Sequence, residues 1–110
     1  MTLHEMADFG RALVTDGHLS DITYYQYDDE SNPPKLPYAA YYEGSIRSYF
    51  ADNQTYFRDD PPITLELYTR RKDLALEAEI ERRLDGKRWE RVGTQWLSSE
   101  QTYQTLYYVY

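Results

Sequence analysis

The chain of 110 residues contains no cysteine. This absence excludes a disulfide framework, a thiol nucleophile and any metal site that needs thiolate ligands. Glycine is also scarce, and neither a glycine-rich phosphate-binding motif nor the G-x-S-x-G motif of serine hydrolases occurs. No apolar run reaches the roughly 18 residues of a membrane span. We therefore expect no catalytic site, no cofactor and no membrane insertion.

Basic residues are outnumbered: the chain has 12 Lys and Arg against 19 Asp and Glu, for a net charge of −7. Contacts of Lys and Arg with phosphates supply most non-specific affinity for nucleic acid, so this balance argues against a DNA-binding groove. Residues 1–17 show no basic leader followed by an apolar stretch, so we expect no secretion signal.

Metal-binding patterns are missing as well. The only histidines, His4 and His18, do not have the spacing of a zinc site, and we interpret both as surface residues. Acidic clusters lie at 28–30 and 59–60, and the first lacks the glycine and glutamate positions of a calcium-binding loop. They are interpreted as solvated loop charges, and no metal is expected.

Tyrosine, by contrast, is abundant, with 13 residues against three Phe and two Trp. A tyrosine ring buries a large apolar area while its hydroxyl needs a partner or water. This composition suits half-buried sheet faces and the cores of protein interfaces. Tyrosine is also a good strand former, so for any single Tyr both interpretations stay open.

Capping signals predict two helices. Thr2 and Glu5 have the capping-box pattern, which predicts a helix over residues 3–15, and Gly17 supplies a left-handed stop. Asp73 can cap a second helix, whose apolar positions follow at helical spacing and are Leu76, Ile80 and Leu84.

Between and after the helices, β-branched and aromatic runs predict strands. These runs are Ile22–Tyr27, Leu36–Glu43, Ile46–Phe50, Ile63–Thr69 and Tyr103–Tyr110, with shorter pieces at 87–92 and 96–97. The run 63–69 alternates, with Ile63, Leu65 and Leu67 on one face and Thr64, Glu66 and Tyr68 on the other. Pro37 predicts an edge or strand-entry position for the second run. Gly93-Thr94 is predicted to be a turn, and 51–62 a long surface connection. The sequence thus predicts one domain, 1–110, of the α+β class: a mainly antiparallel sheet with two helices packed on one face.

Charge is unevenly distributed along the chain. Eight of the 12 basic residues fall between positions 70 and 91, where the net charge is +2, and the rest of the chain carries −9. A protomer with an acidic part and a basic part favours head-to-tail contacts between copies. Such contacts close into a ring when the rotation between neighbouring copies permits. The alternative is an ordinary solvated helix with mixed charges, including an expected pair between Glu79 and Arg83.

Several segments, in order and spacing, resemble the small tail-terminator and head-to-tail joining (tail completion) proteins of long-tailed bacteriophages, siphophages and prophages alike. The residues that carry the resemblance are Pro37-Tyr38-Ala39-Ala40-Tyr41-Tyr42, Ala51-Asp52-Asn53, Tyr56, Ile63 to Thr69, Lys72-Asp73, Glu79-Ile80-Glu81, Leu84, Trp89, Glu100, Tyr103-Gln104 and Tyr107. They extend over nearly three quarters of the chain. Arg70-Arg71-Lys72 and the tyrosine-rich end depart from the pattern.

The resemblance implies a virion structural protein that is monomeric in solution or assembles into a ring of six, which caps the last layer of the tail tube. Its partners would be other copies of itself, the tail tube protein and the head connector, with assembly in the host cytoplasm. DNA would pass through the lumen without specific binding, and acidic walls would let it slide.

On this hypothesis the subunit contacts are made by Tyr38, Tyr41, Asp52, Asn53, Tyr56, Arg70 and Arg71. The exposed backbone of residues 36–43, or the connection 51–62, would add to a neighbour. A second hypothesis is an acidic cytoplasmic regulator that inhibits a nucleic-acid enzyme. A third, a small enzyme with pocket carboxylates, has the least support.

Overall fold

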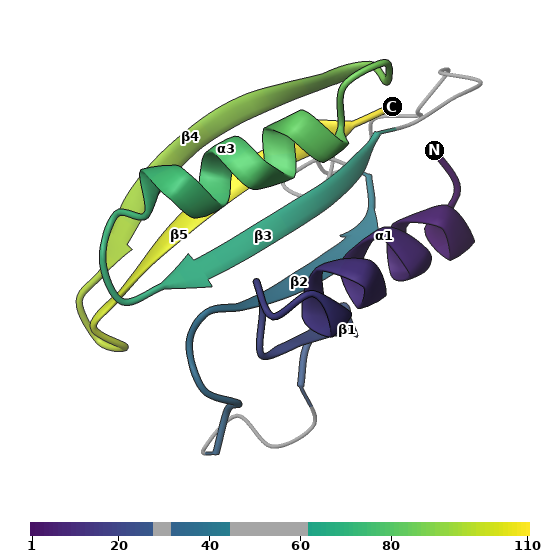
Figure 1. Cartoon of the computed structure of the whole chain (residues 1–110). Coiled ribbons are helices and arrows are strands. Elements are labelled where there is room, and N and C mark those ends of the chain that lie inside the picture. The colour runs from purple at the N-terminus through teal and green to yellow at the C-terminus, as the bar shows by residue number, and fades with distance from the viewer. Residues whose placement is uncertain (28–31, 45–61) are drawn as a thin grey trace, which may run out of the picture.

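The computed structural model describes residues 1–27, 32–44 and 62–110. Within them the chain forms two helices and one five-stranded sheet (Figure 1). The elements are α1 (Leu3–Thr15), β1 (Asp21–Tyr24), β2 (Tyr38–Glu43), β3 (Ile63–Thr69), α3 (Leu74–Arg83), β4 (Trp89–Leu97) and β5 (Thr102–Val109). The strand order is β1-β2-β3-β5-β4, and only the β1–β2 pair is parallel. The predicted α+β class with a mainly antiparallel sheet is confirmed.

Helix α1 has the predicted bounds because its capping box forms. The Thr2 hydroxyl accepts from the amide of Glu5 and the Glu5 carboxylate accepts from the amide of Thr2, both at 3.0 Å. After the helix, Gly17 turns the chain with a φ of 81°, the left-handed conformation that glycine adopts without steric cost. Gly10 is buried on the face of α1 that contacts Ile22 of β1.

Helix α3 also follows its predicted signals. A carboxylate oxygen of Asp73 accepts from the amide of Leu76 at 3.0 Å and caps the first turn. Leu76 and Ile80 are buried, and the expected pair between Glu79 and Arg83 forms at 2.8 Å. Figure 1 shows α1 over β1 and β2, and α3 over β5, on the same side of the sheet.

The core lies between these helices and the sheet. Cross-strand pairs such as Tyr41 with Leu65, and Leu65 with Tyr107, place side chains of three strands on one face. One cluster of buried side chains results, and its members are Met6, Leu13, Leu19, Ile22, Ala39, Tyr41, Ile63, Leu65, Leu67, Leu76, Ile80, Leu84, Tyr107 and Val109. Strand β3 has the predicted alternation, with its three aliphatic residues in this core.

The first two strands differ from prediction. The run 22–27 forms a strand only as far as Tyr24, because Tyr25 adopts a positive φ of 71° and turns the chain away from the sheet. The run 36–43 becomes a strand only after Pro37, which therefore has the strand-entry position. Strand β2 lies between β1 and β3, so the prediction that its backbone edge is exposed for a neighbour is wrong.

The predicted turn at Gly93-Thr94 is also wrong. Strand β4 runs through both residues, with a bulge between Arg91 and Gly93 where the register with β5 shifts. Gly93 has a φ of 157°, and a bulge lets the strand absorb an extra residue and continue. The chain reverses instead at 98–101, where the amide of Glu100 donates to the carbonyl of Leu97 at 3.2 Å.

Some predictions fall outside the described residues. These are the strand 46–50, the connection 51–62 apart from Pro62, and the acidic clusters at 28–30 and 59–60. No helix in the described part of the chain is long and apolar enough to cross a membrane.

Candidate functional site

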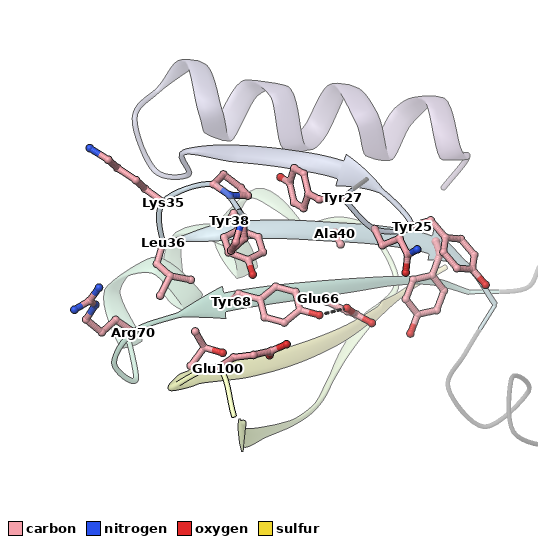
Figure 2. A pocket seen from close by; sticks show the side chains of 15 residues that line it. Tyr25, Tyr27, Lys35, Leu36, Tyr38, Ala40, Glu66, Tyr68, Arg70 and Glu100 are labelled. Atoms are coloured by element: carbon pink, nitrogen blue, oxygen red, sulfur yellow. Dashed lines mark hydrogen bonds between the residues drawn. The ribbon is translucent and has the colours of Figure 1, made fainter. Parts of the chain in front are cut away.

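A cavity of about 690 Å³ opens on the side of the sheet that faces away from the core. Its walls come from β2 and β3, from the start of β5, and from the segments on either side of 28–31 (Figure 2). Its lining includes five tyrosines, which are Tyr25, Tyr27, Tyr38, Tyr42 and Tyr68. A volume of this size is typical of a ligand site, about 300–1,000 Å³.

The tyrosine rings are ordered by the register of the sheet. Tyr38 and Tyr68 are a cross-strand pair of β2 and β3, and their rings stack with centroids 5.0 Å apart. Tyr27 meets Tyr38 edge-on at 5.5 Å, with the ring planes at 89°. The three rings form a continuous aromatic surface along one wall, because aromatic pairs favour stacked and edge-to-face contacts.

Glu66 supplies a half-buried carboxylate to the same surface. The hydroxyl of Tyr68 donates to its Oε2 at 2.5 Å, as the dashed line in Figure 2 shows. Burial first, and then this hydrogen bond, raise the pKa of Tyr68, and burial and Glu66 likewise raise the pKa of Tyr42. Both tyrosines therefore stay neutral donors. Among the described residues, no Lys, Arg or His forms an ion pair with Glu66.

The hydrogen bonds continue from this carboxylate across the sheet. Nε2 of Gln104 on β5 donates to the hydroxyl oxygen of Tyr68 at 2.9 Å. Oε1 of Gln104 in turn accepts from Nε2 of Gln95 on β4 at 2.5 Å. This chain of side chains fixes the position of the Tyr68 hydroxyl, and so holds the Glu66 carboxylate in one orientation.

The other end of the cavity carries a different set of groups. Lys35 and Arg70 are exposed at the rim, and Figure 2 shows them on the same side of the cavity. Thr102 also lines the cavity, and only 5% of this residue is exposed. Its hydroxyl has no hydrogen-bond partner in the described structure. A buried hydroxyl without a partner costs free energy, and this oxygen is itself almost fully covered, so a ligand's donor reaches it only if neighbouring groups move.

Strand β4 forms a second candidate surface, an open edge of the sheet. Its nine residues pair with β5, and in the described residues no strand pairs with its outer side. Val92 and Trp96 on this strand are 45% and 46% exposed. At the opposite edge β1 is only four residues long, and the carboxylate of Asp21 accepts from the amide of Ile22 at 2.8 Å. The open edge of β4 is therefore longer and more apolar.

The basic stretch does not form a basic face. Four of its eight Lys and Arg residues form ion pairs with acids of the same protomer, and these four are Lys72, Arg82, Arg83 and Arg91. Arg83 reaches Asp16 at the end of α1 at 2.6 Å and so links the two helices. The other three pairs join acids of the same stretch, which its net charge of +2 already counts, so of these four pairs only Arg83–Asp16 joins the stretch to the acidic remainder of the chain.

Of the seven predicted contact residues, four lie in the described part of the chain, and these four do not form one surface. Tyr38 and Arg70 line the cavity, and Arg71 is exposed in the turn before α3. Tyr41 lies in the core with 9% of its surface exposed, so little of its side chain is left for a neighbour. The remaining three, Asp52, Asn53 and Tyr56, are outside the described residues.

Sequence reasoning missed Glu66, Thr102 and the edge of β4. A signal existed for Glu66, because it stands between Leu65 and Leu67 in a strand whose other face was predicted to be polar.

In the described parts of the chain, no three His, Cys, Asp or Glu residues come together as metal ligands. No family model, no curated protein and no solved structure matches this chain.

Proposed function

We propose that this chain is a non-catalytic assembly subunit, a phage virion protein that caps the tail tube and joins it to the head connector as a ring of copies. The observation that carries the proposal is the open edge of β4, nine residues long and exposed over most of its length. The resemblance of the sequence to tail-completion proteins adds the identity of the partners.

A long open edge presents a row of backbone donors and acceptors to another strand. Proteins that keep such an edge commonly use it to add a strand of a partner, with main-chain hydrogen bonds giving affinity. Val92 and Trp96 supply apolar area along this edge, and Trp is the residue type most enriched among energetically dominant contacts. The bulge at Gly93 increases the local twist, so a partner strand must match that twist to pair.

A ring needs two different contact surfaces on each subunit. The edge of β4 supplies one. At the short edge strand β1 the amide of Ile22 already donates to the carboxylate of Asp21, so β1 offers fewer free backbone donors to a partner strand. On this proposal the ring holds six copies, and DNA passes through a lumen whose acidic wall repels phosphate. The net charge of −7 favours such passage.

The experiment places a lysine on the edge, a device that proteins use to block strand addition. Wild-type chain mixed with tail tubes and head connectors should label one tube end in electron micrographs and form a ring by light scattering. Val92→Lys and Trp96→Lys should abolish both. Leu74→Lys is the control for the added charge, because Leu74 is 67% exposed and belongs to α3, outside the edge strand.

Labelling along the whole tube, no labelling, or unchanged assembly of both edge variants would overturn the proposal. Salt-sensitive capture of a nuclease or polymerase in place of tail components would support the rival role of an acidic inhibitor.

A further inference from the structure

We propose that the tyrosine-lined cavity binds an arginine side chain presented by an extended segment of a partner polypeptide. This inference deepens the proposed function, on which it rests, because it assigns a second contact surface on the face of the sheet opposite to the helices. The groups that recognise the ligand are Glu66, Tyr38, Tyr68 and Thr102.

The charge of the ligand follows from Glu66. A half-buried carboxylate is costly unless an opposite charge or several hydrogen bonds compensate it. In the described residues it accepts from the hydroxyl of Tyr68 and has no cation as a partner. A carboxylate accepts about four hydrogen bonds, so this one hydroxyl leaves room for further donors. A guanidinium satisfies that capacity with two parallel N–H groups.

The aromatic wall selects for the same group. The stacked rings of Tyr38 and Tyr68 line the cavity, and the hydroxyl of Tyr68 contacts Glu66. A guanidinium stacks on an aromatic ring with a cation–π attraction. Lysine has neither the planar shape nor the forked donors, so arginine fits better. The neutral state of the tyrosines, enforced by burial, keeps the wall free of competing negative charge.

The opposite end of the cavity fixes the ligand's length and direction. Glu66 pairs with Leu106 on β5, and Thr102 lies four residues earlier on that strand, on the same face. At about 3.3 Å per residue, the two sites are roughly 13 Å apart. A single ion cannot contact both ends, whereas an extended peptide can lie along the cavity from Glu66 to Thr102. The exposed cations Lys35 and Arg70 lie at that end, where the exposed Glu100 also lines the cavity, so the charge there is mixed. Glu66 is the half-buried carboxylate and has the greater need of a cation, so the guanidinium lies at the Glu66 end.

The test titrates wild-type chain, labelled with ¹⁵N, with a blocked tetrapeptide that carries one arginine. The controls are the same peptide with citrulline, which has nearly the same shape without the charge, and with glutamate. We expect chemical-shift changes at Glu66, Tyr68 and Thr102, and affinity for the arginine peptide at least about tenfold above the citrulline peptide. Equal binding of the two, or preference for the glutamate peptide, would overturn the proposal, and neither comparison depends on a variant that must fold.

Variants then locate the site. Glu66→Gln should remove the preference for arginine over citrulline, and Tyr38→Ala should reduce affinity through loss of the stacked wall. Glu90→Gln carries the same change of net charge at an exposed position on β4 and should bind as wild type. Val92→Lys should also keep arginine binding. If Val92→Lys fails to assemble but still prefers the arginine peptide, the edge and the cavity act separately. If the wild-type chain does not prefer the arginine peptide over the citrulline peptide, the cavity proposal is rejected and the proposed function is not.

Discussion

The ammonium group of Lys72 lies 2.6 Å from Oε2 of Glu77, a residue that is only 1% exposed. The same ammonium donates to the hydroxyl of Thr94 at 3.0 Å, and Arg91 approaches the other carboxylate oxygen of Glu77 at 3.7 Å. Lys72 therefore ties the turn before α3 to the first turn of that helix and to β4. Because a buried carboxylate needs compensation, this contact contributes to holding α3 on the sheet.

Replacement of Lys72 by Met should lower the free energy of unfolding. Arg91 remains near Glu77 and the Lys72 side chain is partly exposed, so we expect a loss of about 1–3 kcal/mol rather than the full cost of a buried unpaired charge. Urea denaturation at neutral pH measures it. Lys87→Met, at an exposed position without an ion pair in the described structure, should change stability by less than about 0.5 kcal/mol. Equal losses in the two variants would contradict this role of Lys72.

Acid stability should depend on Glu79. Hydrogen bonds from Arg82 and then Arg83 lower the pKa of Glu79 from 4.5 to about 2. Between these values the unfolded chain binds a proton that the folded chain does not, so the contribution of Glu79 to stability is complete above pH 4.5 and is lost as the pH falls to 2. Glu79→Gln should be less stable than wild type at pH 7 and should lose less stability between pH 4.5 and 2.

Urea denaturation at pH 7, 4.5 and 3 measures this difference, and Glu90→Gln is the control for the change in net charge. Parallel stability curves for wild type and Glu79→Gln below pH 4.5 would show that the two arginines do not hold the carboxylate in its ionised form.

Local rules account for the elements that the sequence predicted well. The bounds of α1 follow from Thr2 and Glu5, and the start of α3 follows from Asp73, because capping acts over three residues of chain. The prediction of strand β3 follows from the alternation of apolar and polar residues along 63–69. None of these signals requires knowledge of a distant segment.

The elements that were missed depend on pairing between distant segments. Gly93 resembles a turn locally, and only its pairing with β5 shows it to be part of a strand. The insertion of β5 between β3 and β4, which leaves β4 at an edge, has no local signal. Sequence reasoning therefore placed the open edge on the wrong strand.

The candidate site shows the same division. Tyr38 and Tyr41 are three residues apart in one strand, so their side chains point to opposite faces. The sequence indicated a tyrosine-rich strand without indicating which face the helices cover. Tyr38 lies in the cavity and Tyr41 in the core, because the register of β2 with β3 pairs Tyr41 with Leu65.

Gly10 should resist substitution because α1 lies so close to β1. A Cβ atom at Gly10 would stand 2.0 Å from Cδ1 of Ile22. Gly10→Ala gains up to about 1 kcal/mol of helix propensity and loses about 1–3 kcal/mol to overpacking, so we expect net destabilisation. Ile22→Val removes the clashing atom. It should therefore lower the free energy of unfolding less in the Gly10→Ala background than in the wild-type chain. Ala12→Gly, exposed on the same helix, measures the propensity difference by itself.

Strictly additive changes in the free energy of unfolding for the Gly10 and Ile22 substitutions would contradict close packing at this contact. Thermal or urea denaturation of the two single variants and the double variant gives the coupling.

Truncation of Tyr41 should act on folding before it acts on any contact between subunits. Tyr41 is 9% exposed and belongs to the core, so Tyr41→Ala should cost about 3–5 kcal/mol, the range for removal of a buried aromatic ring. Tyr24 meets Tyr41 edge-to-face at 5.6 Å but is 45% exposed, so Tyr24→Ala should cost about 1 kcal/mol. Urea denaturation of the isolated chain measures both. If Tyr41→Ala loses little stability but assembles poorly, the result would instead support the predicted role of Tyr41 in a subunit contact.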